Sequence, residues 1–476
     1  MKLTKRYIKI PVSLSAPLKR LIFKMDGEIF FDLEAKYCED GEFTAYAESP
    51  IKDKEIDITI DGRPVLFEES DAVELDGLYK EKGRPAVHFT VANGWNNDPN
   101  GMIKYGDLYH MFYQYNPCAP EWGNMHWGHA VSTDMLTWKE LPVALMPDRL
   151  GTMFSGSAIE DKDGNMILFY TAAGSTSLLS SGAKFSQCRA LSSDGFTFEK
   201  YEGNPVIPHI EAENRDPKVV YSKTLEKYLL AIFLNDNRYA LFTSDDLTSF
   251  EKLDEITLDG DAECPDILVF DYEGKEKYVL MGASDKYVVG SLDTGRFIKE
   301  TETLTLCPSS VSYAGQSISG LDGRVVRISW HRLPVKGGRF SQQMSIPYEL
   351  TLEKGENGFY LKSAPISELL SLRLAPIAEG CALTGTKVYE LSDAAYDIEL
   401  DCVGGTVFLS VFGNTLEFSS HGKARIIVDR KSIELWYNDY ECYEVHYIEY
   451  ESSSLSITAE DGVNSLSIYP LKDIHE

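Results

Sequence analysis

The sequence predicts an all-β protein in which a five-bladed β-propeller follows a small N-terminal β module and precedes a C-terminal β-sandwich. Three observations lead to this prediction. The chain contains 27 Tyr and 22 Phe against only 11 Met, and aromatic rings suit a half-buried pleated sheet better than a helix. Short stretches of alternating apolar and polar residues occur towards both ends of the chain. Between them a turn-like motif recurs every 48 to 60 residues, which is typical of propeller blades.

Composition bounds both the domain count and the class of ligand. A chain of 476 residues is long enough for two to four domains. Hydrophobic residues at 43% and charged residues at 25% are values of globular proteins with real cores. The formal charge of -28 repels phosphate backbones and anionic membranes, so we expect neither nucleic acid nor a membrane as a partner. A neutral, polyhydroxylated substrate does not experience that repulsion.

The sequence also bounds the compartment. Residues 1–10 are basic, but alternating residues follow them rather than an apolar core, so no signal peptide is predicted. No apolar run approaches the ~18 residues of a membrane span. We therefore expect a cytoplasmic protein. The cysteines lack CxxC pairs, which argues against zinc and for buried, reduced thiols; they are Cys38, Cys118, Cys188, Cys264, Cys307, Cys381, Cys402 and Cys442.

Residues 1–82 are predicted to form the small β module. Apolar residues alternate at 8–12 and again at 56–60, and the second run ends in Asp61-Gly62, a hairpin signal. Nothing in this part of the chain suggests chemistry. We expect it to act through packing or through contact with sugar.

The recurring motif places the propeller at residues 83–353. Its first copy, 132–138, is followed by copies at 192–198 and 243–250 and by a looser one at 290–297. In this alignment the shared aspartates are Asp134, Asp194, Asp245 and Asp293. Each copy follows strand-like runs, and a fifth unit is predicted at 313–332. The predicted strands are 108–115, 166–171, 228–233, 278–281 and 324–330.

The pattern changes after the turn at residues 355–358. Residues 354–374 are predicted to be a linker that contains a short helix at 365–372, capped by Ser367. Residues 375–476 are predicted to form the β-sandwich, because short alternating strands separated by turns return there. These strands are expected at 406–412, 424–428, 432–437, 454–457 and 465–469.

The stretch 94–101 contains the first candidate catalytic carboxylate. It places Asp98 next to three amides and a tryptophan, between two glycines. This is turn chemistry, and an ordinary surface turn has the same composition. The repeat favours a catalytic role, because Asp98, Asp216 and Glu263 each open a blade-like unit at the strand nearest the axis. Carboxylates at equivalent places in successive blades must converge on the central funnel.

Converging carboxylates suit the cleavage of glycosides, in which one acid attacks the anomeric carbon and another protonates the leaving oxygen. Glu263 is the better proton donor, because an apolar strand start disfavours its ionised form. Asp98, surrounded by amides, should stay ionised. Asp216 beside Arg215 should also stay charged and accept hydrogen bonds from sugar hydroxyls. The alternative for Arg215-Asp216 is a surface ion pair.

Two histidines suggest a metal centre as an alternative to carboxylate chemistry. His126 and His129 lack a third ligand at usable spacing, so we expect a structural role or a place at the substrate rim for them. Cys264 follows the predicted proton donor directly. Its thiol either tunes the pKa of Glu263 or is a plain buried thiol.

Six motifs in order carry a resemblance over residues 87–350. The chain resembles the β-fructosidases of glycoside hydrolase family 32, which include invertases, levanases, inulinases and sucrose-6-phosphate hydrolases. The resemblance implies a five-bladed propeller with an appended sandwich and a retaining mechanism on terminal β-fructofuranosyl units. The tail adds 427–434, which is similar to a strand of that family's sandwich. The six motifs are 95–101, 111–117, 122–129, 154–157, 215–217 and 263–266.

The resemblance also assigns roles to residues. It implies that Asp98 is the nucleophile, Glu263 the general acid and base, and Asp216 the stabiliser of the transition state. No metal or cofactor is expected, and the partner is a small-molecule or oligosaccharide β-fructoside. Whether the chain forms a homo-oligomer stays open. The implied substrate-binding residues are Asn97, Gln114, Trp122, Phe154, Ser155, Arg215, Trp95 and Trp330.

The chain departs from the family pattern near the pocket rim. Asn96 stands where the family usually has Met, Asn214 where an aromatic residue is common, and Tyr348 where Arg is usual. The leading hypothesis is an exo-β-fructosidase acting on fructo-oligosaccharides, sucrose or fructans. A fructosyltransferase and a non-catalytic sugar-binding propeller are the alternatives. Linkage preference and chain length stay open, and the acidic charge disfavours sucrose 6-phosphate.

Overall fold

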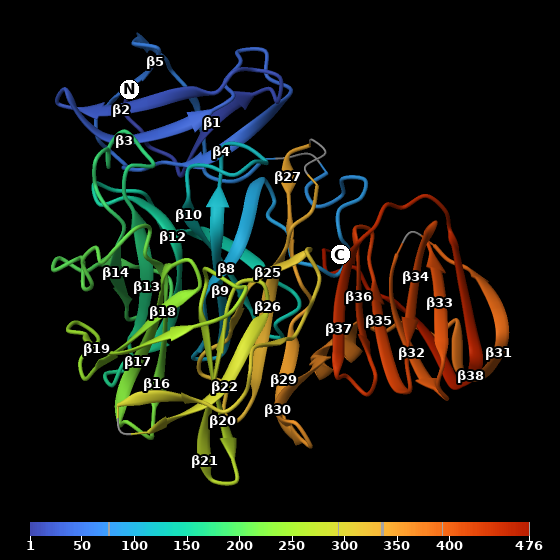
Figure 1. Ribbon diagram of the computed structural model, residues 1–476. Helices are drawn as coiled ribbons and strands as arrows, with labels where there is room; N and C mark the ends of the chain where they lie inside the picture. Colours follow the sequence, from blue (N-terminus) through green and yellow to red (C-terminus); the bar gives the residue numbers. More distant parts are fainter. Residues whose placement is uncertain (75–76, 294, 335–337, 393, 476) are drawn as a thin grey trace.

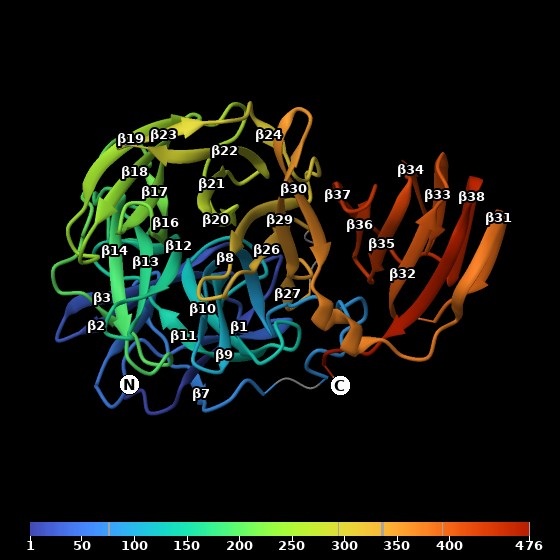
Figure 2. The same ribbon diagram turned by 90° about the horizontal axis from the view of Figure 1, so that it is seen from below.

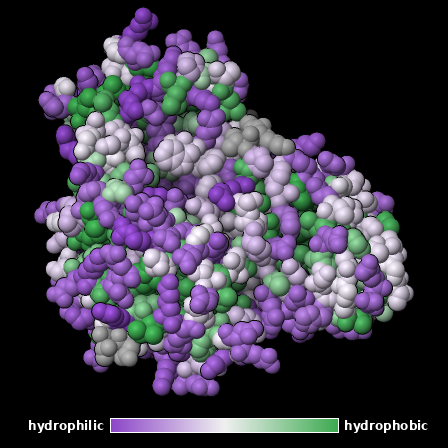
Figure 3. Space-filling model, in the orientation of Figure 1, coloured by the Kyte–Doolittle hydropathy of each residue, from purple (hydrophilic) through white to green (hydrophobic). Residues whose placement is uncertain are grey.

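The computed structural model describes residues 1–74, 77–293, 295–334, 338–392 and 394–475. The N-terminal module lies above the propeller in Figure 1, and the C-terminal sheet lies at the propeller's side. Within the described residues the only helix is a short 3-10 helix, η1 (Ser367–Leu372). The predicted all-β class is therefore confirmed. The face in Figure 3 shows hydrophobic side chains in small scattered groups among hydrophilic ones.

Two small sheets enclose the core of the N-terminal module, in the orders β4-β1-β7 and β3-β2-β5-β6. The alternation predicted for the first strand is observed, since Ile8, Ile10 and Val12 are buried. Asp61 and Gly62 connect β5 and β6 with φ values of 51° and 75°, as a tight hairpin turn requires. The strands are β1 (Tyr7–Val12), β2 (Lys19–Met25), β3 (Glu28–Ala35), β4 (Phe43–Glu48), β5 (Asp57–Ile60), β6 (Arg63–Pro64) and β7 (Glu68–Ser70).

Five antiparallel sheets follow and surround a common axis, which Figure 2 shows from below. The first strand of each blade lies innermost. Blade one contains β8 (Gly94–Tyr105), β9 (Leu108–Asn116), β10 (His126–Ser132) and β11 (Lys139–Leu145), and blade two contains β12 (Thr152–Glu160), β13 (Met166–Ala173), β14 (Ser186–Ser192) and β15 (Glu199–Lys200). Blade three contains β16 (Arg215–Ser222), β17 (Lys227–Asn235), β18 (Arg238–Ser244) and β19 (Glu251–Thr257).

The last two blades have the same plan with additional short strands. Strand β27 (Phe340–Ser341) returns to pair in parallel with β8 of blade one. A segment that lies between two strands of blade five in the chain therefore pairs with blade one, which closes the ring. Blade four contains β20 (Asp266–Tyr272), β21 (Lys275–Met281), β22 (Lys286–Asp293), β23 (Arg296–Lys299) and β24 (Leu304–Thr305); blade five contains β25 (Ser312–Ser317), β26 (Val325–His331), β28 (Gln343–Met344), β29 (Tyr348–Gly355) and β30 (Gly358–Pro365).

The recurring aspartate closes the turn after the third strand of a blade. A side-chain oxygen of Asp134 accepts hydrogen bonds from the backbone N–H groups two and three residues further on, and Asp194 does the same. In the third copy the aspartate with these two bonds is Asp246. The predicted alignment on Asp245 was therefore wrong by one residue. In the loose fourth copy, Thr294 lies outside the described residues.

The predicted linker also needs correction. Strands β29 and β30 pair along their whole length and form the outer part of blade five. The predicted propeller boundary at 353 cuts through β29, and 354–365 belong to the blade. Only η1 and the residues around it connect the domains. Ser367 is the first residue of η1 rather than its cap, and no side chain caps that helix.

The C-terminal strands form one sheet that folds over itself at β38. The first half of β38 pairs with β33 and the second half with β32, and both halves contribute to one core. Figure 2 shows the two resulting layers. The strands predicted at 454–457 and 465–469 are two parts of this strand. The strands are β31 (Ala378–Glu390), β32 (Ala395–Cys402), β33 (Thr406–Val411), β34 (Asn414–Ser419), β35 (Gly422–Val428), β36 (Ser432–Tyr437), β37 (Cys442–Tyr447) and β38 (Ser454–Leu471).

A fully buried histidine joins this sheet to the propeller. His88 Nδ1 lies 2.8 Å from an oxygen of Asp429, and His88 Nε2 lies 2.8 Å from an oxygen of Glu434. Burial acts to lower the pKa of His88, but the two carboxylates prevail and raise it to about 9. One apolar core continues across the same interface, from Val87 to Trp436. The two domains are therefore held together by an imidazolium inside a shared core.

We expect His88→Gln to destabilise the protein by about 3–5 kcal/mol near neutral pH, because two buried carboxylates lose their cation. A histidine whose pKa is raised in the folded state contributes its full stability below its unfolded pKa of about 6.5. That contribution is lost as the pH rises through about 9. The difference in melting temperature between variant and parent should therefore be large at pH 6 and shrink towards pH 10.

Calorimetry of the two proteins across this range checks the prediction. The exposed His421 supplies the matched control, and His421→Gln should change the melting temperature little at any pH. A His88→Gln deficit that stays constant from pH 6 to pH 10 would contradict a charged His88.

Candidate active site

The innermost strands of three blades are irregular at the residues that face the axis. Asn97 and Asp98 together stand opposite Gln114 alone, because the pairing of β8 with β9 shifts between Asn96 and Pro99. The pairing of β12 with β13 shifts at Ser155, and that of β16 with β17 shifts around Asp216. A bulge of this kind bends the strand and turns a side chain out of its regular direction. The stretch 94–101 is thus a bulged strand, and its interpretation as a turn was wrong.

These side chains line a pocket of about 230 Å³ at the centre of the propeller. Its lining residues come from all five blades, from β8 of blade one to β26 of blade five. The three candidate acids, far apart in the sequence, lie in this one pocket. The lining residues are Asn97, Asp98, Gln114, Trp122, Phe154, Ser155, Glu213, Arg215, Asp216, Glu263, Cys264, Tyr313 and Trp330.

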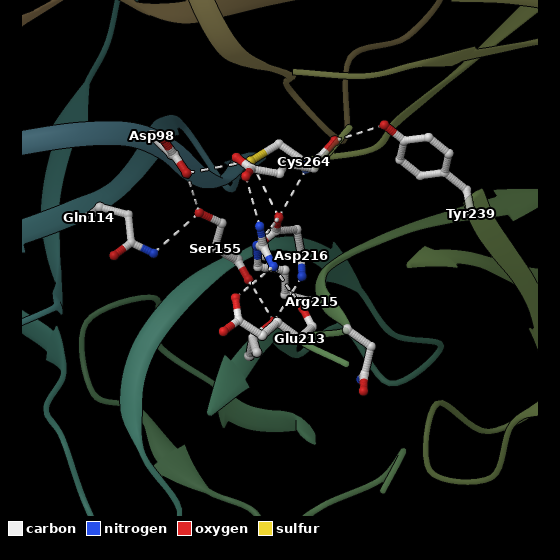
Figure 4. A network of polar contacts seen from close by, with 12 residues as sticks. Asp98, Gln114, Ser155, Glu213, Arg215, Asp216, Tyr239 and Cys264 are labelled. Carbon is white, nitrogen blue, oxygen red and sulfur yellow. Dashed lines mark hydrogen bonds and ion pairs between the residues drawn. The ribbon is translucent and has the colours of Figure 1, made fainter. Parts of the chain in front are cut away.

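Cys264 lies between two of the acids, as Figure 4 shows. Its Sγ is 3.4 Å from Asp98 Oδ2 and 3.5 Å from Asp216 Oδ2, and its backbone N–H donates to Asp216 Oδ2 at 2.9 Å. Burial and the neighbouring carboxylates raise the pKa of this thiol well above its usual value. The thiol is therefore protonated, and it contacts Asp98 and Asp216 rather than Glu263.

Asp98 accepts hydrogen bonds from Ser155 and Asn97 in addition to the contact with the Cys264 thiol. Ser155 Oγ donates to one carboxylate oxygen at 2.6 Å, and Asn97 Nδ2 donates to the other at 3.1 Å. Gln114 in turn donates to Ser155 Oγ at 3.2 Å. Burial raises the pKa of Asp98, and the bonds from Ser155 and Asn97 oppose this rise. The predicted amide environment is present in part, through Asn97, and it holds the carboxylate in one orientation.

Burial strongly perturbs Asp216. Burial raises its pKa to about 7, against the charge of Arg215 and the N–H of Cys264. Asp98 and Glu263 add to this rise through their own negative charge. The expectation that Asp216 stays fully charged therefore fails near neutral pH. A hydrogen bond from its own N–H to Thr171 Oγ1, 2.8 Å long, fixes the backbone.

Glu263 is held by a cation and a phenol. Arg215 donates to one of its carboxylate oxygens at 2.7 Å, and Tyr313 donates to the other at 2.9 Å. Its side chain is 35% exposed, so it is in contact with the pocket as well as with the protein. Glu263 can serve as a proton donor because it faces the pocket between these two donors.

The backbone is strained where the acids lie. Asp216, Glu263 and Cys264 have φ values of 66°, 59° and 34°, in the left-handed region that residues with a Cβ rarely adopt. Such strain costs of order 1–3 kcal/mol per residue and persists only where the surrounding structure imposes it. Here the left-handed backbone of Cys264 directs its N–H at Asp216.

Most of the predicted pocket residues lie where they were expected. Trp122, which is 57% exposed, and Phe154 meet edge to face at the pocket mouth, with ring centroids 6.1 Å apart. Trp330 lines the opposite wall. Trp95 is the exception, because it lies behind the wall, packs edge-on against Trp330 and donates to Asn97 Oδ1. Trp95 therefore supports the pocket without lining it.

Two residues of the pocket were missed from the sequence. Tyr313 reaches Glu263 from β25 of blade five. Glu213 lies at the mouth, 73% exposed, with a carboxylate oxygen 3.7 Å from Arg215. Only its place two residues before Arg215 could have suggested it. His126 and His129 are buried inside the first two blades, where His126 contacts a backbone oxygen and His129 contacts His110.

Comparison with protein-family models identifies the family of the propeller. Residues 88–365 match the N-terminal domain of glycosyl hydrolases family 32. The chain belongs to glycoside hydrolase family 32. It is therefore a glycoside hydrolase of the β-fructofuranosidase type, and its substrates are fructosides. The match ends at Pro365, the last residue of β30, in agreement with the corrected boundary of the propeller.

Relatives with known activities support this membership. A levanase of Bacillus subtilis is 31% identical, over 83% of this chain and 71% of the levanase. A sucrose-6-phosphate hydrolase of Zymomonas mobilis is 30% identical, over 71% of each chain. The solved structure of a Bombyx mori family 32 β-fructofuranosidase variant in complex with sucrose is 25% identical. It has a TM-score of 0.68 and covers 84% of this chain and 95% of that one.

No helix among the described residues is long and apolar enough to span a membrane.

Replacing Asp216 with Asn should stabilise this family 32 enzyme while it inactivates it. An acid whose pKa is raised on folding costs stability progressively as the pH rises from its unfolded value of about 3.9. For Asp216 the full cost is reached above about pH 7. At roughly 1.4 kcal/mol per pKa unit the gain has an upper limit of about 4 kcal/mol. Activity should fall on the order of 10²-fold or more, because charge stabilisation is lost.

Thermal unfolding at pH 4 and pH 8 tests this expectation. The melting temperature of Asp216→Asn should exceed that of the parent at pH 8 and equal it at pH 4. A gain of the same size at both pH values would show that charge burial is not the cause.

Asn96→Met should also stabilise the protein. Asn96 is fully buried on β8, two residues before Asp98, and neither polar atom of its side chain has a hydrogen-bond partner. An unsatisfied buried polar group costs about 1–3 kcal/mol, and methionine adapts to irregular space. Urea unfolding should show a gain of this size. Asn97→Met is the matched control and should lose stability, because Asn97 bonds Trp95 and Asp98.

Proposed function

We propose that the enzyme is a retaining exo-β-fructosidase that releases terminal, non-reducing fructosyl units from neutral fructo-oligosaccharides, sucrose or fructans. The observation that carries this proposal is the shared contact of Cys264 with Asp98 and Asp216, while its neighbour Glu263 faces the same pocket. A retaining enzyme needs a nucleophile and an acid close together, with no water between them. The small pocket supports action on chain ends, since its volume of about 230 Å³ suits one sugar ring.

Each acid has a distinct role in the proposed reaction. Asp98 attacks the anomeric carbon of the fructosyl unit and forms an ester, while Glu263 gives its proton to the leaving oxygen. Water then enters, Glu263 removes a proton from it, and the ester bond to Asp98 breaks. Asp216 accepts hydrogen bonds from the fructose hydroxyls and stabilises the positive charge that develops in the transition state. Arg215 contacts both Glu263 and Asp216 and keeps them in place.

The charges at the pocket support a neutral substrate. Among the lining residues Arg215 is the only arginine or lysine, and four carboxylates share the pocket with it. Arg215 is already committed, because it contacts Glu263, Asp216 and Glu213. Phosphate recognition requires free cationic donors. A phosphorylated sucrose would instead meet Glu213 at the mouth.

The nucleophile is tested by Asp98→Asn. We expect it to abolish the release of fructose from sucrose, 1-kestose, inulin and levan, because the amide cannot form the ester. Binding of sucrose should persist, because the remaining pocket is unchanged. Product analysis by nuclear magnetic resonance on the parent enzyme should show β-fructofuranose as the first product. If α-fructofuranose appears first, the mechanism is inverting and the proposed ester is not formed.

Discrimination against phosphate is tested at Glu213. The parent should have a lower kcat/KM for sucrose 6-phosphate than for sucrose, and Glu213→Arg should narrow this ratio by about tenfold, since one good charge contact provides about 1.4 kcal/mol. Glu199→Arg makes the same charge change at an exposed residue of blade two and should leave the ratio unchanged. A parent enzyme that prefers the phosphate ester would refute the proposed neutral substrate.

A further inference from the structure

A second cavity lies between the N-terminal module and blade one. Its volume is about 400 Å³, larger than that of the catalytic pocket. The module lies directly against this blade in Figure 1. The cavity lies on the other face of β9, since Gln114 lines the catalytic pocket while Tyr113 and Tyr115 line the cavity. Alternate residues of a strand face opposite sides, so one strand separates the two spaces.

Aromatic rings form a large part of the cavity wall, beside aliphatic and charged side chains. They come from both sides of the domain boundary, with Tyr7 and Tyr46 on the module and Tyr113, Tyr115 and Trp138 on the propeller. Tyr7 and Tyr46 meet edge to face, with centroids 6.2 Å apart. Such rings offer flat apolar faces for stacking with a ligand.

Two acceptor oxygens that line the cavity have no hydrogen-bond donor among the described residues. The side-chain oxygen of Asn93, a residue that is 2% exposed, has no hydrogen-bond donor. Glu48 accepts one hydrogen bond, from the N–H of Val143 to Oε2 at 2.7 Å, and among the described residues its Oε1 has none. These groups can accept hydrogen bonds from a ligand that carries donors.

The charges select among such ligands. Glu48 and Glu140 repel anions, and burial raises the pKa of both. Arg6 and Lys52 near Glu48, and Arg84 near Glu140, already offset part of this negative charge. A purely apolar ligand would leave the free acceptors unsatisfied. A neutral polyol with apolar ring faces satisfies both the aromatic wall and the acceptors.

We propose that this cavity is a second, non-catalytic binding site for a neutral saccharide of about disaccharide size. The N-terminal module then has the task of completing a sugar site on the outer face of blade one. The proposal is independent of the proposed catalytic function, because it concerns binding alone.

Tryptophan reporters can observe the two sites separately. Trp138 lines the cavity, and Trp122 and Trp330 line the catalytic pocket. Full-length Asp98→Asn protein labelled with 5-fluorotryptophan is titrated with sucrose, glucose, fructose and 1-kestose, and its fluorine resonances are followed. Single Trp→Phe variants assign the signals. We expect the Trp138 resonance to shift and saturate with at least one of these sugars, at a concentration different from that which saturates Trp122 and Trp330.

A matched pair of variants locates the binding. Val143→Phe fills the cavity and keeps the backbone bond to Glu48, so it should abolish the Trp138 shift and leave the Trp122 shift, which also shows that the variant is folded. Val143→Ala enlarges the cavity and should retain both. The proposal fails if Trp138 does not respond to any of these sugars, or if its response survives Val143→Phe. It also fails if tetramethylammonium shifts Trp138 more strongly than the sugars do, because the site would then be one for organic cations.

Discussion

The active site depends on breaks in the hydrogen-bonded ladders of the innermost strands. In β8, β12 and β16 one extra residue interrupts the pairing with the next strand, and a bulge re-aims the side chain at that point. Because a propeller places its innermost strands around one axis, three local irregularities act on the same small volume. With regular pairing at this point, the side chain of Asp98 would follow the usual alternation between the two faces of the sheet. The outer strands can vary without touching this arrangement.

Bringing several carboxylates together at the axis is energetically unfavourable, and the packing of the surrounding blades offsets this cost. Asp98 and Asp216 are buried with raised pKa values, and among the described residues Arg215 is the one cation in contact with these acids. The left-handed backbone at Glu263 and Cys264 adds strain. Unbroken apolar cores lie between successive blades, for example from Phe112 to Tyr170. A rigid ring of blades therefore holds groups that would separate in a looser fold.

The sequence was most informative where the physics is local. Alternation predicts a strand, and an aspartate that binds the N–H groups two and three residues further on predicts a blade turn, so the blades and the acids that open them could be found. The exact alignment of the third copy of the motif could not be found in this way, because Asp245 and Asp246 are adjacent aspartates and the sequence does not distinguish them. Tyr313 and Glu213 reach the pocket only because the fold brings their segments there, and no local pattern in the sequence shows this. For Trp95, the sequence does not distinguish a tryptophan that lines the pocket from one that packs behind its wall. The helix cap at Ser367 failed because η1 starts at that residue.

The two faces of β9 connect the parts of the molecule that the sequence keeps apart. Tyr115 pairs opposite Asn96 and Tyr113 opposite Pro99, so the two rings that face the module bracket the bulge that carries Asp98. The strand also supplies Gln114, which donates to the serine that holds Asp98. A ligand that moves either ring acts on the pairing on both sides of Asp98. The N-terminal module, which covers these rings, therefore adjoins the catalytic machinery through the thickness of a single strand.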